Sequence, residues 1–436
     1  MLRTRLRPCW GMAFFALSWA SQAGGAEAIQ LGDVVPKELR SSPSISTDVI
    51  CVHAEDVERV LNDSAEALEK NGLPPWEPSK EDEQKHYADV SIAYFIQLSQ
   101  PEKLSLVKRV FDLLYSPTDA FLYSVDADKL AVADVEQALG LVGARKLSRP
   151  NVRVQAAAHA DYYFWPRVQI VLDGMTQLLD EQWDFVIHLS ESDYPAHSAS
   201  YIRHALSQQR QRNFIQITPR CWQLENGTTT YSPWFWNYVD GVAVSCGSES
   251  KAYLNTSLHW PQQEMEDVGI RFGSSSEWVI LTRELVEYSA KPALIDFKRI
   301  MSLRIESDES FWATLILSIP GMTQSISQQG WFISWDRSEG QPQHSPATLN
   351  NQLGQEVFDN PNMYLFVRKV SEGNSSAFLD RIDRRIRSET LQDKSEQDVD
   401  FAKFEAPLNV ERTRCPKDAP VWFLNPIFLH DLPRAP

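Results

Sequence analysis

The feature that most constrains the fold of this chain is a strand–helix–strand pattern that begins near residue 90. The apolar run Val90–Leu98 is long enough for a buried strand, and apolar residues at helical spacing follow over Leu104–Leu114. Pro117 ends that helix, and Phe121–Val125 predicts a second strand that ends at Asp126. Two strands joined through a helix pair in parallel within one sheet, so the sequence predicts an α/β fold.

The same pattern recurs farther along the chain. Further strands are predicted at 151–154, 185–189 and 214–217, with helices at 168–179 and 201–206. This alternation is typical of a doubly wound, mostly parallel sheet flanked by helices, in which ligands bind beyond the carboxyl ends of the strands. Asp126 and the polar loop Ser190–Tyr194, which ends at Pro195, directly follow predicted strands. We therefore expect both at the ligand-binding edge.

The composition is that of a soluble globular protein. Hydrophobic residues make up 43% and charged residues 23% of the 436 positions, which allows a sizeable core. The formal net charge of −16 repels phosphate backbones and argues against nucleic-acid binding. The 14 Trp residues are many for this length. Most are expected in the core, although an indole face also suits a sugar ring.

The N-terminal segment has the pattern of a targeting sequence. Arg3, Arg5 and Arg7 precede the apolar run Trp10–Ala20, and small residues follow it. Because a bilayer span needs about 20 apolar residues, the run favours a cleaved signal peptide over a short membrane anchor. Both alternatives direct the chain into the secretory pathway.

The cysteines and sequons are consistent with that route. Past the N-terminal segment the cysteines are Cys51, Cys221, Cys246 and Cys415. In an oxidising compartment they permit two disulfides in any of three connectivities, and the alternative is buried free thiols. Glycosylation sequons, which support a lumenal location weakly, occur at Asn62, Asn226, Asn255 and Asn374.

We divide the chain into four segments. They are a signal peptide or short signal anchor at 1–28, an N-terminal helical stem or linker at 29–85, a catalytic domain at 86–390 and a C-terminal tail at 391–436. The stem holds one amphipathic helix candidate over Ala54–Lys70, followed by a polar, acidic stretch with prolines.

Several familiar catalytic signatures are missing from the sequence. It contains no glycine-rich phosphate loop, no nucleophile elbow and no His-Glu-x-x-His pair, and its nine His lack metal-ligand spacing. What remains is a set of acidic and aromatic residues near the ends of predicted strands.

These residues carry a family resemblance. The segment Trp183–Pro195, WDFVIHLSESDYP, resembles the signature of glycosyltransferase family 14, which includes peptide O-xylosyltransferases, core-2 and I-branching N-acetylglucosaminyltransferases and plant β-glucuronosyltransferases. Further blocks, in the family's order, are Tyr94–Leu98, Phe121–Asp126, Asn151–Val154 with Trp165, Gly273–Tyr288, Asp308–Leu315, Phe332–Asp336 and Leu365–Lys369. The resemblance spans roughly 90 to 386 and implies a Rossmann-like nucleotide-sugar-binding domain of the GT-A type.

The resemblance also implies the chemistry, an inverting transfer from a UDP-sugar without a metal. A base must take the proton of the acceptor hydroxyl, and a positive group must stabilise the departing diphosphate. Glu309 matches the family's catalytic glutamate, and its neighbours Phe311 and Trp312 suit a desolvated base. The alternative is a capping role, since Ser307 and Asp308 also stand at the start of an apolar run.

Donor-binding residues follow from the same blocks. Lys369 matches the family's phosphate-binding lysine, and Arg368 and Arg337 are further candidates for the diphosphate. For Arg337 the alternative is a solvated surface charge. Asp126 matches the aspartate that contacts the nucleoside in relatives. It begins an Asp-x-Asp pair with Asp128, a pattern that binds Mn²⁺ in many GT-A enzymes, but it stands too early in the fold for that role.

Other positions are assigned to the sugar or the acceptor. Glu277 and Trp278 resemble an acidic–aromatic pair that faces the acceptor or the transferred sugar in xylosyltransferases, and core packing is the alternative for Trp278. Asp193 and Trp335 are assigned to the substrate on the same grounds. The segment Glu191–Asp193 stands near the usual metal position of GT-A enzymes, although the family implies that no metal is bound.

The donor sugar stays open among xylose, glucuronate and N-acetylglucosamine. The segment Asp193–Pro195 favours the xylosyl and glucuronosyl branches, but Pro166 and Arg167 stand where relatives usually have two glycines. We expect a glycan or glycoprotein acceptor and a location in the Golgi lumen. Alternatives from other classes are a secreted glycan-binding protein on a degenerate transferase fold and a glycoside hydrolase, which would need two carboxylates and no diphosphate pocket.

Overall fold

The computed structural model describes most of the middle of the chain. The described ranges are 50–77, 90–143, 149–218, 221–223, 229–231, 241–246, 249–254, 262–322, 326–327, 330–335, 346–361 and 364–391. The predicted targeting segment, Arg337 and Cys415 lie outside them. Within the described residues, no helix has both the length and the apolarity that crossing a bilayer requires.

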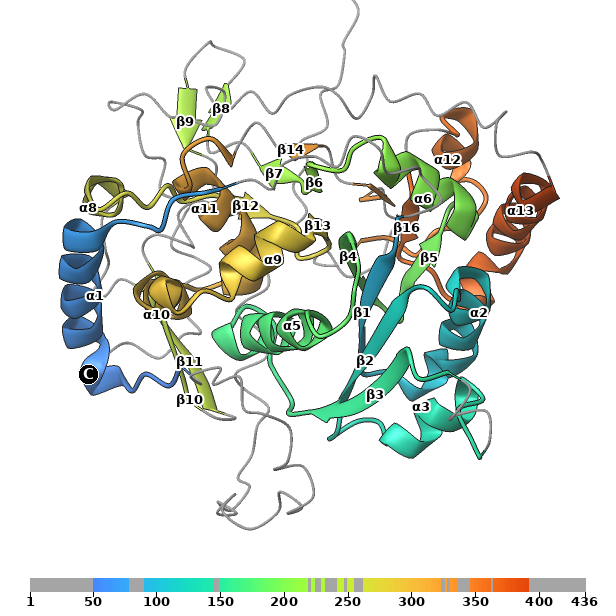
Figure 1. Cartoon of the computed structure of the whole chain (residues 1–436), viewed down its shortest axis with the longest axis horizontal. Coiled ribbons are helices and arrows are strands. Elements are labelled where there is room, and N and C mark those ends of the chain that lie inside the picture. Colours follow the sequence, from blue (N-terminus) through green and yellow to red (C-terminus); the bar gives the residue numbers. More distant parts are fainter. Residues whose placement is uncertain are drawn as a thin grey trace, which may run out of the picture.

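The elements of the described ranges are as follows (Figure 1). The strands are β1 Ile92–Leu98, β2 Ala120–Asp126, β3 Val152–Ala157, β4 Phe185–Ser190, β5 Asp193–Pro195, β6 Asn213–Phe214, β7 Ile217–Thr218, β8 Cys221–Gln223, β9 Thr229–Tyr231, β10 Gly241–Cys246, β11 Glu249–Leu254, β12 Ser274–Ser275, β13 Ile280–Thr282, β14 Ile326–Ser327, β15 Trp331–Ile333 and β16 Phe366–Arg368. The helices are α1 Val57–Asn71, α2 Leu104–Leu114, α3 Val132–Ala138, α5 Trp165–Leu178, α6 Ala199–Ser207, α8 Gln262–Asp267, α9 Arg283–Ser289, α10 Ile295–Ser302, α11 Phe311–Ser318, α12 Gln355–Asp359 and α13 Glu372–Leu391. Short 3-10 helices are η2 Ala54–Asp56, η4 Pro101–Lys103, η5 Pro292–Leu294 and η6 Ser307–Glu309.

A seven-stranded sheet organises the domain, in the order β14-β6-β13-β4-β1-β2-β3. Strands β4, β1, β2 and β3 run parallel, whereas β13 is antiparallel to both β4 and β6. The chain builds outward from β1 to β3 and then returns through α5 to place β4 on the other side of β1. The predicted α/β fold, with a mostly parallel sheet flanked by helices, is confirmed.

Helices cover both faces of this sheet because its strand residues alternate between them. Ala93 and Phe95 of β1 face a core formed with α5, α9, α10 and α11. Ile92, Tyr94 and Ile96 of the same strand face a second core formed with α2, α3 and α6. Figure 1 shows α5, α9 and α10 on one side of the sheet and α2 and α3 on the other.

A second, three-stranded sheet of order β15-β16-β5 borders the main sheet. Strand β16 is parallel to β15 and antiparallel to β5, and Arg368 on β16 stands opposite Asp193 on β5. The segment that precedes Pro195 was predicted as a loop, so β5 was missed. The strand is three residues long and pairs with β16 alone, which tolerates a terminal proline that cannot donate a backbone hydrogen bond.

The C-terminal helix α13 packs against α2 and β5. Asp383 accepts hydrogen bonds from the Tyr194 hydroxyl at 2.5 Å and from Arg109 at 2.6 Å. Near the end of the helix, Glu389 accepts from the buried His197 ring at 2.6 Å and from the backbone N–H of Ser198 at 2.7 Å. The helix therefore braces the segment that joins β5 to α6.

The N-terminal helix α1 belongs to the same packed unit as the sheet. Figure 1 shows α1 beside α10, and the hydroxyl of Ser64 on α1 donates to Asp296 on α10 at 3.4 Å. The segment after α1 also contacts the domain, since the Tyr288 hydroxyl donates to the carbonyl of Pro74 at 2.6 Å. The helix predicted at Ala54–Lys70 is thus present and packed, as η2 followed by α1.

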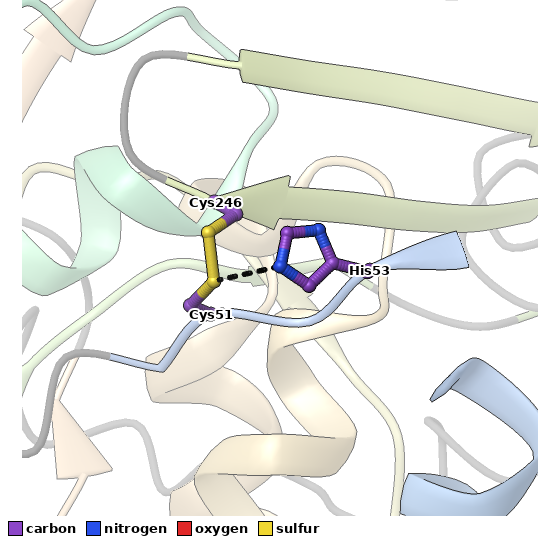
Figure 2. Close-up of a disulfide and its surroundings, with 3 residues drawn as sticks. All are labelled: Cys51, His53 and Cys246. Carbon is purple, nitrogen blue, oxygen red and sulfur yellow. Dashed lines mark hydrogen bonds between the residues drawn. A yellow bond between two sulfur atoms is a disulfide. The ribbon is translucent and has the colours of Figure 1, made fainter. Parts of the chain in front are cut away.

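A disulfide between Cys51 and Cys246 fastens this N-terminal segment to the end of β10 (Figure 2). The bond connects residues 195 positions apart in sequence. His53 lies beside it, with Nε2 3.8 Å from the Cys51 sulfur. In the described part of the chain, these three residues are the group whose metal-ligating atoms converge within 4.8 Å. Because the thiolate is the metal-binding form of cysteine, the disulfide removes both sulfurs from that role.

We expect the disulfide to contribute several kcal/mol to stability. Replacing both cysteines, as Cys51→Ala with Cys246→Ala, should lower the free energy of unfolding by about 4 kcal/mol, because the bond closes a long loop in the unfolded chain. Chemical denaturation with and without reductant measures this. Reductant should weaken the wild type more than the double variant; equal denaturation midpoints for the two oxidised proteins would contradict the assignment.

Candidate active site

A cleft opens beyond the carboxyl ends of the parallel strands. It is open to solvent. It is centred on β1, at the point where the strand order reverses between β2 on one side and β4 on the other. The residues that line it are Gln97, Leu98, Ser99, Gln100, Ser124, Asp126, Ala157, Ala158, Ala160, Tyr162, Arg167, Ile170, Ser190, Glu191, Ser192, Arg368 and Lys369.

One end of the cleft combines small apolar walls with a carboxylate. The walls are the methyl groups of Ala157, Ala158 and Ala160, and the carboxylate belongs to Asp126, the last residue of β2. His159 donates to Oδ2 of Asp126 at 2.8 Å, and a backbone N–H donates to Oδ1 at 3.2 Å. A flat ring fits between such walls, and the oriented carboxylate can accept hydrogen bonds from it.

The middle of the cleft carries a buried acid, Glu191, at the switch point of the sheet. Its Oε1 accepts hydrogen bonds from Gln100 at 2.8 Å and from Ser99 at 3.1 Å, both in the segment that follows β1. Beside it, the Lys103 ammonium donates to the hydroxyl of Ser192. The loop after β4 is therefore tied to the loop after β1.

Cationic side chains gather at the opposite wall. Arg368 and Lys369 end and follow β16 and line the cleft, and Lys103 lies close to both. Burial, together with the charges of Arg368 and Lys103, lowers the pKa of Lys369 to about 8. Burial likewise lowers the pKa of Lys103, opposed by the nearby charge of Glu191. Crowded, desolvated cations of this kind gain stability when an anion binds.

Arg368 is held in place by a buried network. Its guanidinium donates to Asp193 at 2.8 Å and to the hydroxyl of Ser190 at 2.6 Å. It also lies 3.8 Å from the ring centroid of Trp278. The other oxygen of Asp193 accepts from the indole N–H of Trp331 at 3.1 Å.

These contacts locate two residues that sequence reasoning assigned to the substrate. Asp193 is 1% exposed and Trp278 is 4% exposed, and neither is among the residues that line the cleft. Both carboxylate oxygens of Asp193 accept hydrogen bonds from side chains inside the protein. This position suits a residue that holds Arg368 in place better than one that binds a sugar directly. For Trp278, the alternative of core packing fits the structure, because its ring lies between Arg368 and the imidazole of His188.

Glu277 belongs to a second charged group, centred on Arg167. Arg167 donates to both carboxylate oxygens of Glu277, at 2.8 and 3.0 Å, and lies 3.7 Å from Asp308. Burial opposes ionisation of Glu277, but the charge and hydrogen bonds of Arg167 outweigh it, and its pKa is lowered. The Arg167 guanidinium also lies 3.9 Å from the ring centroid of Tyr162 at the rim of the cleft.

Behind Glu277 stands His188 of β4. Its ring is fully buried, with Nδ1 2.9 Å from the carbonyl of Glu277 and Nε2 2.9 Å from the side chain of Gln97. Burial lowers the pKa of His188 to about 4, so the ring is neutral near pH 7. A neutral ring carries one N–H and can donate to only one of its two oxygen neighbours, the Glu277 carbonyl or Oε1 of Gln97, which lines the cleft.

Glu309, the predicted base, ends η6 just before α11 begins at Phe311. It is half-buried and is not among the described residues that line the cleft. Its neighbour Asp308 contacts Arg167, which does line the cleft. Burial raises the pKa of Tyr163, and the charges of Glu306 and Glu309 add to that shift, so Glu309 lies close to the Tyr163 phenol.

Of the remaining predicted residues, Trp335 is 37% exposed after β15 and is not among the described residues of the cleft, and Arg337 lies outside the described residues. Of the residues predicted for the donor, Asp126, Arg368 and Lys369 line the same cleft. The sequence analysis did not single out Lys103, Arg167 or Tyr162 as cleft or near-cleft residues, whereas it placed Glu191 in a loop at the ligand-binding edge. The only advance signal was at Arg167, which replaces a glycine usual in relatives.

The chain resembles known proteins in sequence over more than half of its length. The profile named Core-2/I-Branching enzyme matches residues 92–360, more than half of the chain. Xylosyltransferase oxt of Drosophila pseudoobscura pseudoobscura is 24% identical over 263 residues, which cover 58% of this chain and 27% of that protein. Xylosyltransferase 2 of Homo sapiens is 23% identical over 274 residues, which cover 61% of this chain and 29% of that protein. The chain thus spans less than a third of the length of these relatives.

Among solved structures, the mannosyltransferase Ktr4p from S. cerevisiae matches 66% of this chain and 80% of its own, at 10% identity and a TM-score of 0.30. A likeness this weak adds nothing to what the strand order already establishes.

The buried pair of Asp193 and Arg368 makes a stability prediction. Asp193→Asn should lower the free energy of unfolding by about 3 kcal/mol, because it leaves a buried guanidinium without its counter-charge. Asp63→Asn makes the same chemical change in an exposed ion pair on α1 and should cost less than about 1 kcal/mol. Urea denaturation at pH 7 measures both. Equal losses of unfolding free energy in the two variants would show that the buried pair contributes no more than the exposed one.

Proposed function

Because the chain belongs to the Core-2/I-branching enzyme family of glycosyltransferases, family 14, we propose that it is an inverting glycosyltransferase that moves a sugar from a UDP-sugar to an acceptor hydroxyl. The family resemblance drawn from the sequence blocks is confirmed by this membership. The observation that carries the proposal is the cleft at the switch point, with Asp126 at one end and Lys369 with Arg368 at the other.

In the proposed complex, the nucleoside and the diphosphate of the donor bind at different ends of the cleft. The nucleoside lies between the alanine methyl groups and Asp126, whose carboxylate accepts hydrogen bonds from it. The diphosphate lies against Lys369 and Arg368, with Lys103 behind them. Arg337 stays a candidate for the same role. Fixed cations of this kind offset the charge of a leaving diphosphate, and we propose that they do so without a divalent metal.

Catalysis in this proposal needs one proton transfer and one displacement. The acceptor oxygen attacks the anomeric carbon from the side opposite the diphosphate while Glu309 takes the hydroxyl proton. The bond between the anomeric carbon and the diphosphate breaks, its electron pair leaves with UDP, and the configuration inverts. Glu277 and Trp335 stay candidates for contacts to the transferred sugar or the acceptor.

The substrates and the location are the finer part of the proposal. Xylose is the donor sugar that the names of the matched relatives support best, with glucuronate and N-acetylglucosamine as alternatives. The acceptor is proposed to be a glycan or a glycoprotein. The Cys51–Cys246 disulfide supports an oxidising compartment, and we propose the Golgi lumen, reached as a secreted or membrane-anchored protein.

The proposal predicts that removing the base abolishes transfer and spares donor binding. Glu309→Gln should lower kcat by roughly 100-fold or more, the usual contribution of a general base, while the Kd for UDP changes by less than about threefold. Glu66→Gln, on the exposed face of α1, is the matched control. Transfer is measured with UDP-xylose, UDP-glucuronate and UDP-N-acetylglucosamine, and UDP binding by calorimetry. The proposal would be refuted if the wild type transferred none of these sugars and if Glu309→Gln bound glycans as well as the wild type does.

A second prediction concerns the pH dependence of donor binding. The pKa of Lys369 is about 8 in the free protein, and a bound diphosphate should raise it. UDP binding at pH 8 should therefore take up about half a proton at Lys369, and affinity should fall as pH rises above 8. Calorimetry in two buffers with different ionisation enthalpies measures the uptake. In Lys369→Arg, whose charge is permanent, the uptake should drop to what Lys103 supplies; an unchanged uptake would place the diphosphate elsewhere.

A further inference from the structure

Arg167 occupies a position that is costly for a cation. It lies in the first turn of α5, where the positive end of the helix dipole disfavours a positive charge, and that turn contains no acidic residue of its own. Its side chain is only 11% exposed. Such a placement persists only when carboxylates from elsewhere compensate it.

Two carboxylates from distant parts of the chain provide that compensation. Glu277, just before β13, accepts two hydrogen bonds from Arg167, and Asp308 of η6 lies 3.7 Å from its Nε. Arg167 also lines the cleft, with the ring of Tyr162 against its guanidinium. One side chain therefore touches the cleft, the segment before β13 and the segment that carries Glu309.

The Asp308 carboxylate that contacts Arg167 also binds two backbone N–H groups. Its Oδ1 accepts a hydrogen bond from the backbone N–H of Glu309 at 3.1 Å, and its Oδ2 accepts from the backbone N–H of Tyr163 at 3.1 Å. The Tyr163 carbonyl in turn accepts from the backbone N–H of Glu306 at 2.7 Å. Only the carboxylate form of Asp308 offers acceptors to both N–H groups without a competing O–H.

The surroundings of Asp308 oppose that carboxylate form. Burial and the negative charge of Glu277 raise its pKa to about 6, and the charge of Arg167 is the main opposing influence. The other titratable groups around the cluster are Arg368 on β16, His188 on β4, which is neutral, and Glu306 and Glu309 beside Tyr163. In the described part of the chain, the ion-pair partner of Asp308 is Arg167.

We propose that Arg167 is a positioning residue for the base: its cation holds Glu277 and Asp308 together at the wall of the cleft, and through Asp308 it fixes the backbone that carries Glu309. This inference rests on the proposed transferase function, since it assigns Arg167 a role in presenting the proposed base. It adds a link between the donor cleft and Glu309, which do not share a wall. Arg167 is then the connection between them.

The link has a direct consequence for pH dependence. Without the cation of Arg167, two buried acids face each other, and one proton should be retained near neutral pH. Asp308 is then the expected holder of that proton, and its bonds to the N–H groups of Glu309 and Tyr163 weaken. Raising the pH removes the proton and restores the acceptors, so the defect should shrink at alkaline pH.

The test compares Arg167→Gln, which removes the charge, with Arg167→Lys, which keeps it. Asp308→Asn gives a permanently neutral Asp308 site, and Arg153→Gln, on β3, is the matched control. Two readouts are taken on the full chain. The first is amide hydrogen exchange of peptides that cover 303–313, which needs no turnover. The second is the pH profile of kcat together with the KM for the UDP-sugar.

Arg167→Gln should speed amide exchange in 303–313 at pH 7 and lower kcat at least 10-fold, with the acid limb of the kcat profile shifted upward by about one pH unit and KM changed less than threefold. Arg167→Lys should restore most of both signals, and Asp308→Asn should reproduce the loss without adding to it in the double variant. Unchanged exchange in 303–313, or an equal loss in Arg153→Gln, would overturn the positioning role. If wild type transfers no sugar but exchange responds as expected, the transferase proposal fails and the structural link stands.

Discussion

The cleft depends on one cross-strand ion pair. Arg368 on β16 and Asp193 on β5 stand opposite each other in register, and their side chains are almost wholly buried. Burying two charges is favourable only when geometry and additional hydrogen bonds are good, and here Ser190, Trp331 and the Trp278 ring supply them. The pair joins the small sheet to the end of β4 and so sets where Lys369, the next residue, enters the cleft.

Ion pairs of this kind reconcile the anion binding that we propose for the cleft with the acids that line it. Arg368 is matched by Asp193 and Arg167 by Glu277, so these four charges largely cancel within the protein. The cations that burial has left strained are Lys369 and Lys103, whose pKa values are lowered. An anionic ligand relieves that strain, whereas the paired arginines mainly shape the wall against which it lies.

A feature of the fold or the cleft could be predicted from the sequence only where it depends on residues that are close together along the chain. Apolar runs predicted β1, β2 and β4, and strand ends placed Asp126 at the cleft, because both depend on neighbours along the chain. The seven-residue helix α3 was missed since only Val135 of its residues is buried. The pairs Arg167–Glu277 and Arg368–Asp193 join residues 110 and 175 positions apart, and no local pattern records them. For that reason the sequence could place Asp193 and Trp278 near the substrate but could not show that both contact Arg368.

Arg368 and Arg167 are held in place by different kinds of structure. Arg368 is fixed by a strand register, which cannot slip without moving every residue of β16 to the opposite face. Arg167 is fixed by carboxylates on two separate segments, one before β13 and one in η6, so its position depends on contacts between parts of the chain that are far apart in sequence. In the proposed complex, strand register therefore supports the diphosphate end of the cleft, and side-chain ion pairs support the segment that carries Glu309.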